Sequence, residues 1–150
     1  MLFRSIEPLE LGRRQWLDLL ISLVIQPALP AGTLTFVSDF PADQAALARI
    51  RPGSPPVAER FELYLGSVEL ANGYQELSDP IEQARRFEAE NEQRKQRGLP
   101  VYKSDQNLLD ALAHGLPDCA GVALGVDRLL MAIEGLDHLN GAIAFPCDRA

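Results

Sequence analysis

The sequence predicts an α+β fold in which helices flank an antiparallel sheet. Strand-like and helix-like segments are mixed, but residues 59–70 resemble a β-hairpin, which breaks the strict alternation of a parallel sheet. The 150 residues, 47% apolar and 23% charged, suit one domain or part of a larger one. The longest apolar run, residues 17–25, contains Asp18 and Ser22 and is too short to span a bilayer, so we expect no membrane association.

The first third of the chain predicts a helix, a strand and a second short helix. Apolar residues recur at helical spacing over residues 13–26, and Pro27 ends the run. Residues 33–37 are typical of a short strand, because Thr, Phe and Val suit a pleated surface. Residues 42–50 predict a short helix, and residues 51–56 a turn-rich loop.

The middle of the chain predicts a hairpin followed by a charged helix. Two strands, residues 59–65 and 67–70, flank Gly66. Asp79 is a good helix cap, Pro80 fits the first helical position and Glu82 can complete a capping box. We expect this helix to reach about residue 97 and to lie at the surface, since its apolar stripe is thin.

The last third predicts a helix, a strand–helix unit and a final strand. Residues 105–114 form a helix that ends at Gly-Leu-Pro. Residues 120–124 predict a buried strand that leads directly into a helix over residues 127–134. Residues 142–145 predict a last short strand.

The charge and the cysteines restrict the class of function. A net charge of −7 argues against sequence-independent binding of nucleic acid, which needs clustered Lys and Arg, although a small specific contact remains compatible with it. Cys119 and Cys147 form neither a zinc pattern nor a disulfide framework. We therefore expect two reduced thiols in a cytoplasmic protein.

The hairpin carries two carboxylates that suggest a metal site. With a loop at Leu65 and Gly66, Glu62 lies opposite Glu69, about 5 Å away on the same face. Two like charges at this distance favour a cation between them, and an oxygen-only pair suits Mg²⁺ beside substrate phosphates. The alternatives are two solvated glutamates or a different strand register.

The next strand carries a set of side chains suited to an amine. Alternation places Asn72, Tyr74 and Glu76 on one face, with Glu76 as counter-charge and Tyr74 as an apolar wall. The same alternation puts Glu69 on the other face, so a common pocket requires a bulge at Gly73 or nearby. The alternative is a half-exposed polar strand.

A glycine-rich junction between strand and helix suggests contact with phosphate. Small residues at 120, 121, 123 and 125 allow a ligand to approach the backbone closely. Arg128 follows at the helix start, where a guanidinium and free N–H groups together bind phosphate oxygens. In the alternative, the glycines serve packing and Arg128 pairs with Asp127 or Glu134.

These segments together resemble a known family. Gly-Val-Ala-Leu-Gly-Val-Asp-Arg at residues 121–128 resembles motif 3 of class II aminoacyl-tRNA synthetases, the strand and helix that hold ATP. Residues 60–63 and 69–77 resemble the lysyl branch of that class, and the likeness continues through residues 79–87 to 145–149. Three blocks in the right order are more specific than any single motif.

The resemblance implies roles for individual residues. Glu62 and Glu69 match the acidic residues that hold Mg²⁺ beside ATP, and Arg128 matches the catalytic arginine on the γ-phosphate. The ATP-binding positions are then Glu69, Leu70, Gly125 and Arg128, and the lysine pocket is formed by Asn72, Tyr74, Glu76 and Ala123, with Glu76 as partner of the substrate amine.

Two details resemble the elongation factor P ligases within this family. Residues 69–73 read Glu-Leu-Ala-Asn-Gly where lysyl-tRNA synthetases usually have Glu-Ile-Gly-Asn-Gly, and Ala123 replaces a usual glycine. The resemblance implies a ligase that uses ATP and Mg²⁺ to activate lysine or β-lysine and transfers it to a lysine of elongation factor P. The complete enzyme would be a homodimer. A fragment of a true tRNA-Lys ligase and a non-catalytic synthetase-like binding module are the alternatives.

The family's motifs 1 and 2 are missing from the sequence. Motif 1 builds the dimer interface, and motif 2 supplies an arginine on the α-phosphate. We therefore expect residues 1–150 to be a single partial catalytic domain, the C-terminal half of the core, which is incomplete and inactive alone.

Overall fold

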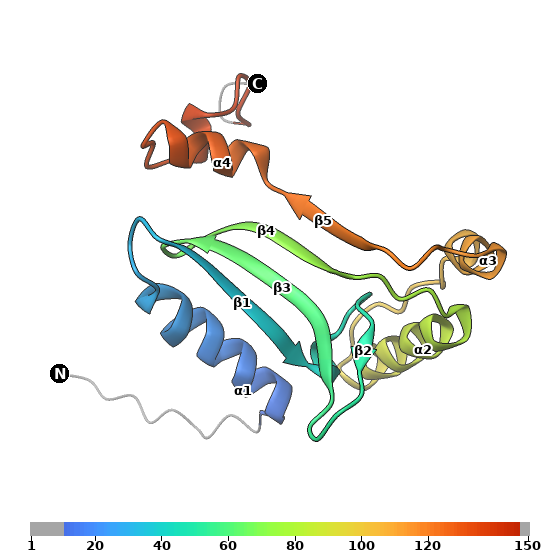
Figure 1. The fold of residues 1–150 in the computed structure, drawn as a ribbon. Coiled ribbons are helices and arrows are strands. Elements are labelled where there is room, and N and C mark those ends of the chain that lie inside the picture. Colours follow the sequence, from blue (N-terminus) through green and yellow to red (C-terminus); the bar gives the residue numbers. More distant parts are fainter. Residues whose placement is uncertain (1–10, 148–150) are drawn as a thin grey trace.

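The computed structural model describes residues 11–147, which form a five-stranded antiparallel sheet with helices around it (Figure 1). The strand order is β1-β3-β4-β5, and β2 pairs with β3. This arrangement confirms the predicted α+β fold. The strands are β1 (Leu34–Pro41), β2 (Ile50–Arg51), β3 (Val57–Leu65), β4 (Val68–Gln75) and β5 (Ala120–Leu124).

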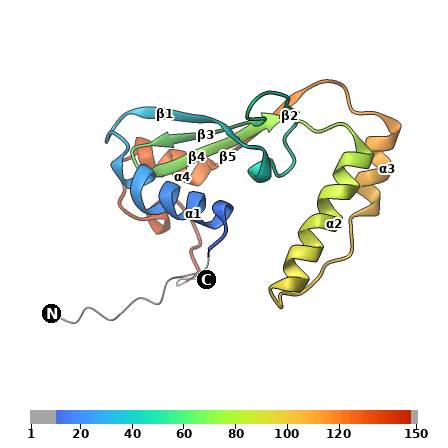
Figure 2. The same cartoon turned by 90° about the horizontal axis from the view of Figure 1, so that it is seen from below.

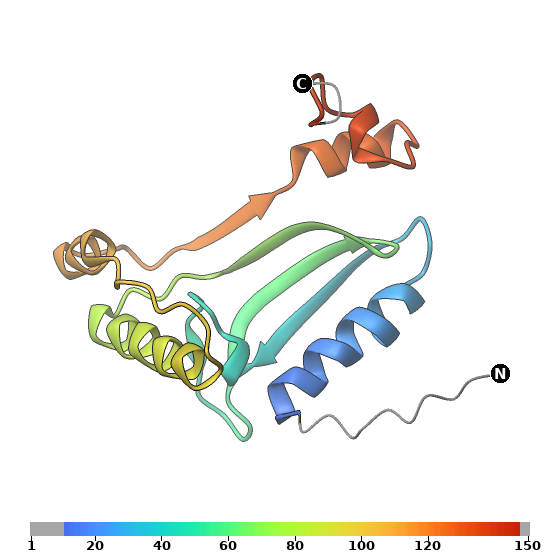
Figure 3. The ribbon, with the colours of Figure 1, turned by 180° about the vertical axis from the view of Figure 1, so that it is seen from behind.

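Within the described residues, four α-helices surround the sheet, and the sequence predicted all four. They are α1 (Arg13–Leu20), α2 (Pro80–Gln96), α3 (Gln106–His114) and α4 (Val126–Ile133). Helices α1 and α4 lie on the same side of the sheet (Figure 2), α1 along the β1 edge and α4 beyond the end of β5 (Figure 1). Helices α2 and α3 lie next to each other at the opposite end of the strands (Figure 3).

Helix α2 begins as its sequence predicts, with one difference. The Asp79 carboxylate accepts hydrogen bonds from the backbone N–H groups of Ile81 and Glu82 at 2.8 and 3.2 Å. Glu82, however, does not complete a capping box, because its carboxylate accepts a hydrogen bond from Nε of Arg86 at 3.0 Å. An (i, i+4) ion pair has replaced the reciprocal cap.

The helix predicted over residues 42–50 is wrong beyond its first turn. Only Ala42–Gln44 is helical, as a 3₁₀ turn, and Ala46 then has a φ of 51°. The completely buried Ala48 forms a β-bridge with Glu76, and the Arg86 guanidinium donates to the carbonyls of Ala46 and Ala48 at 2.9 and 2.8 Å. Tertiary partners thus take the backbone groups that a helix would have used.

Two expectations near the C-terminus are also wrong. Residues 142–145 form no strand and follow a 3₁₀ turn at Leu139–Gly141. Strand β5 is not buried, and Val122 is 64% exposed, because β5 is an edge strand that pairs only with β4 in the described part of the chain. Asp148 and Arg149, which belong to the resembling segment, lie outside the described residues.

The two faces of the sheet differ in character. Phe40, Ala45, Ala48 and Ala58 form a small core on the side of α1. The polar candidate residues lie on this side too, where Glu62 shares a cleft with residues of α1. The opposite face carries apolar side chains, as the strand pairing shows. In the part of the chain that the structure describes, four of them are largely exposed: Leu34, Phe36, Val122 and Leu124.

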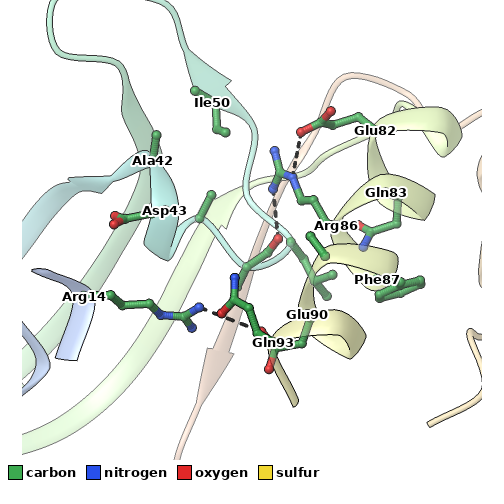
Figure 4. Close-up of a pocket in the computed structure, with 14 residues that line it drawn as sticks. Arg14, Ala42, Asp43, Ile50, Glu82, Gln83, Arg86, Phe87, Glu90 and Gln93 are labelled. Carbon is green, nitrogen blue, oxygen red and sulfur yellow. Dashed lines mark hydrogen bonds and ion pairs between the residues drawn. The ribbon is translucent and has the colours of Figure 1, made fainter. Parts of the chain in front are cut away.

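Arg86 connects α2 to the body of the protein in a cleft of about 470 Å³ (Figure 4). Its side chain is only 17% exposed, so Arg86→Ala leaves two carbonyls and the Glu82 carboxylate without their donor. We expect the free energy of unfolding to fall by about 2 kcal/mol. Denaturant unfolding would measure it, with Arg85→Ala at the neighbouring exposed position as control. Equal losses in the two variants would contradict this role.

Candidate active site

A β-bulge brings the candidate carboxylates onto one face of the sheet. Leu65 pairs with Val68 around a turn at Gly66 and Ser67, one residue later than predicted. Leu70 is then extra in β4, because Tyr64 pairs with Glu69 while Leu63 pairs with Ala71. The prediction that Glu62 lies directly opposite Glu69 is therefore wrong, since Glu62 pairs with Asn72.

The same bulge brings the two sets of candidate residues onto one face, as a common pocket requires. Because Leu70 interrupts the alternation, Glu69 joins Asn72, Tyr74 and Glu76 on the face that also carries Glu62. The bulge lies at Leu70 and not at Gly73, but its effect is the one that a single pocket requires. Five candidate side chains from β3, β4 and the residue that follows β4 thus share one face.

Glu62 is the centre of a closed hydrogen-bond network. Its carboxylate is buried and accepts from Arg60 Nη2 and the Tyr64 hydroxyl, both at 2.5 Å, and from Asn72 Nδ2 at 3.2 Å. Arg60 also lies over the Phe40 ring, 4.5 Å from its centroid. A buried carboxylate with three donors, one of them a cation, is held in a fixed position.

Because of Tyr64, the stability that this network contributes depends on pH in the alkaline range. Burial raises the pKa of the Tyr64 hydroxyl above its ordinary value, and Glu62 and Glu69 raise it further. The folded protein therefore holds this proton more tightly than the unfolded chain does. The corresponding stability is fully present below about pH 10 and is lost as the pH rises above that value.

We expect Tyr64→Phe to flatten the alkaline part of the stability profile. The variant loses one hydrogen bond to Glu62, which costs about 1 kcal/mol at neutral pH. Its free energy of unfolding should then fall less steeply above about pH 10. Denaturant unfolding of both proteins at several alkaline pH values measures the difference. If the two proteins lose stability equally steeply above about pH 10, Tyr64 does not contribute to the alkaline pH dependence.

Glu76 directly follows β4 and, like Glu69, has an unpaired carboxylate in the described part of the chain. It is half-buried, and within residues 11–147 its carboxylate has no hydrogen-bond or salt-bridge partner. Burial raises the pKa of the Tyr74 hydroxyl, and the nearby charge of Glu76 raises it further. A partly desolvated carboxylate without a cation is suited to bind a cation from a ligand.

A cleft of about 440 Å³ lies between β4, β5 and the start of α4. Its volume is that of a small-molecule site. It brings together all four residues to which the sequence assigned ATP contacts and two from the amino-acid set: Glu69, Leu70, Asn72, Ala123, Gly125 and Arg128. Glu62 lines a neighbouring cleft of about 220 Å³ with Arg60, and Tyr74 and Glu76 lie outside both clefts.

The junction of β5 and α4 is fixed to the bulge of β4. The Gly125 N–H donates to the Leu70 carbonyl at 2.9 Å, and Arg128 Nη1 donates to the Glu69 carbonyl at 3.0 Å. The alternative in which Arg128 pairs with Asp127 or Glu134 is wrong, since its guanidinium reaches across to β4. The guanidinium thus lies beside the cleft, together with the N-terminal end of α4.

The carboxylates fit Mg²⁺ unequally. Glu69 lines the cleft, and in the described part of the chain its carboxylate makes no hydrogen bond or salt bridge. Glu62 already has three donors, so it can bind an ion only if one of them moves away. One free carboxylate beside a phosphate site suits Mg²⁺, which takes few protein ligands and keeps several waters. Of the two predicted Mg²⁺ ligands, Glu69 therefore fits the ion without a rearrangement, whereas Glu62 does not.

Sequence reasoning missed three residues of this face. Arg60 and Tyr64 complete the Glu62 network, and Gly121 lies next to the Glu76 carboxylate. The alternation of Arg60, Glu62 and Tyr64 along one strand was a usable signal, because residues two apart share a face. Gly121 was noted only as one of the small residues of β5, and its proximity to Glu76 could not be predicted because Glu76 belongs to a different segment.

Two further predictions concern the environment of the protein. Cys119 and Cys147 are both free, as expected. In the part of the chain that the structure describes, no helix is long and apolar enough to cross a bilayer.

Comparisons with known proteins give a consistent result. The family model "tRNA synthetases class II (D, K and N)" matches residues 22–149. An "Elongation factor P--(R)-beta-lysine ligase" of Vibrio cholerae is 51% identical over 144 residues, which cover 96% of this chain and 44% of that protein. Proteins with the same description are 51% identical in Salmonella gallinarum and 50% in Yersinia enterocolitica, over 97% of this chain and 45% of each relative. The chain thus spans less than half the length of these curated relatives.

Proposed function

The chain belongs to the class II tRNA synthetases of the D, K and N group, and on this basis we propose that it forms part of an ATP-dependent ligase for an amino acid with a side-chain amine. The complete ligase activates lysine or β-lysine as an adenylate and transfers it to a lysine of elongation factor P. The observation that carries the proposal is the unpaired Glu76 carboxylate, on the same sheet face as the cleft beside Arg128.

The amino acid lies along β4 in this proposal. Glu76 binds the substrate amine, Tyr74 forms an apolar wall and Asn72 orients the ligand by a hydrogen bond. Asn72 is already fixed by its contact with Glu62, so its amide is oriented before the substrate arrives. Ala123 pairs with Asn72 and narrows the pocket from the side of β5.

ATP lies in the cleft between β4, β5 and α4. Glu69, Leu70 and Gly125 line the nucleotide site, and Arg128 binds the γ-phosphate. Glu69 would hold Mg²⁺ here, and Glu62 would be a second ligand only if one of its three donors moved away. Such an ion would supply positive charge that neutralises the phosphates. The substrate carboxylate attacks the α-phosphorus and pyrophosphate leaves, so positioning and charge neutralisation supply most of the rate.

The proposal also includes the acceptor protein, the other parts of the enzyme and its location in the cell. The relatives, more than twice as long as this chain, are described as acting on elongation factor P. We place this chain in the motif 3 half of one catalytic domain, with the α-phosphate arginine and the homodimer interface supplied by other residues of the complete enzyme. A cytoplasmic location is supported by the two free thiols.

Amino-acid-dependent exchange of pyrophosphate into ATP tests this function in the full-length protein. We expect exchange with lysine or (R)-β-lysine and none with norleucine, which lacks the side-chain amine. Labelled amino acid should then be transferred to elongation factor P and not to tRNA-Lys. Transfer to tRNA-Lys would identify a true synthetase. Absence of Mg-ATP binding by calorimetry would favour a synthetase-like binding module.

A further inference from the structure

Gly121 is the residue of β5 that lies closest to the proposed amine-binding carboxylate. It pairs with Tyr74 in the β4–β5 ladder, so a side chain there would project from the same face as Tyr74 and Glu76. A Cβ atom on Gly121 would overlap Oε1 of Glu76 and come within 3.4 Å of its Cδ. The carboxylate therefore occupies the space that any side chain at position 121 would take.

The backbone does not require glycine at this position. Gly121 is not among the described glycines with positive φ, so alanine is compatible with its conformation. The reason for glycine is thus the space above its Cα atom. The contact is also with the end of a flexible side chain, which can move when a methyl group is added, so the fold should tolerate the change.

We infer that Gly121 is a positioning residue that determines specificity for an amine, because its missing side chain leaves room for the Glu76 carboxylate. This inference rests on the proposed function of Glu76 as partner of the substrate amine. In Gly121→Ala the carboxylate must rotate away from β5, and its distance to the bound amine changes. Because Glu76 has no other partner in the described chain, no second contact holds it in place.

Gly73 provides a matched control in the same pair of strands. A Cβ atom on Gly73 would meet Cε1 and Cζ of Phe61 at 2.7 Å and the Gly121 carbonyl at 2.8 Å. A side chain at position 73 would project from the opposite face of the sheet, where a packed ring and a backbone carbonyl cannot move easily. Gly73→Ala should therefore lower the stability of the fold without a selective effect on the amine.

The test compares the binding of lysine and norleucine, which differ in the side-chain amine alone. In the full-length protein, calorimetry should show that Gly121→Ala lowers the preference for lysine over norleucine by about tenfold to a hundredfold. ATP affinity and melting temperature should stay close to those of the unsubstituted protein. In a Glu76→Gln background, the same Gly121→Ala change should cause no further loss, because the two residues act as one unit.

Three results would overturn the inference. An unchanged lysine preference in folded Gly121→Ala would do so and leave the proposed function intact. If Gly121→Ala lost as much stability as Gly73→Ala and lost affinity for lysine and norleucine equally, Gly121 would be a packing residue. Absence of any lysine preference in the unsubstituted protein would overturn the proposed function as well.

Discussion

Glu76→Gln is expected to abolish amino-acid activation in the full-length protein while ATP still binds. The substitution keeps the size of the side chain and removes the negative charge that, in the proposed function, faces the substrate amine. Loss of one partner of a desolvated charge pair costs about 2–5 kcal/mol, which corresponds to a roughly thirtyfold to several-thousandfold loss of amino-acid affinity. Amino-acid-dependent pyrophosphate exchange and calorimetry with Mg-ATP measure the two effects separately.

The structure predicts that this effect is selective. Glu76 lies outside the cleft assigned to ATP and makes no hydrogen bond or salt bridge within the described residues, so its neutralisation should not disturb the fold. Glu88→Gln, at an exposed position of α2, is the control for a lost surface charge. Equal loss of ATP and amino-acid binding in Glu76→Gln would contradict the assignment of Glu76 to the amine.

Arg128→Gln is expected to lower the turnover of activation by about a hundredfold to a thousandfold, the range for loss of one preorganised donor to a charged transition state. The guanidinium lies beside the cleft and donates to the Glu69 carbonyl, so it is already oriented before a phosphate arrives. Steady-state exchange kinetics with varied Mg-ATP measure this loss and its division between turnover and KM.

The same substitution should change stability little. Arg128 is exposed, and its single described hydrogen bond is to a backbone carbonyl, which water can replace. Arg97→Gln, at the exposed end of α2, is the control for loss of positive charge. If both variants keep full turnover, Arg128 does not contact the reacting phosphates. If Arg128→Gln loses activity only because it unfolds, its melting temperature will show it.

Local sequence signals were sufficient wherever neighbours in the chain decide the structure. The cap at Asp79 and the strand–helix junction at residues 120–128 were predicted, and the turn at Gly66 was predicted to within one residue, because each depends on a few adjacent residues. The membership of the candidate site was predicted from alternation and resemblance, and six of its residues line one cleft.

Local signals failed where distant groups compete for the backbone. Residues 42–50 have the composition of a helix, but Arg86 and the β-bridge of Ala48 take their carbonyl and N–H groups. The apolar pattern of β5 predicted burial, but no described element covers its outer side. For residues 42–50 the deciding partner lies far away in the chain, and for β5 the deciding fact is that it lies at the edge of the sheet.

The sequence by itself determined the fold class, the four α-helices and the chemical types of the candidate site residues, because propensity, capping and alternation act over a few residues. Only the tertiary structure decided how those residues meet. The extra residue at Leu70 turns Glu69 onto the common face, Arg60 neutralises Glu62, and Gly121 leaves space for Glu76. Each of these depends on pairing between strands, where a shift of one residue reverses the face of every side chain.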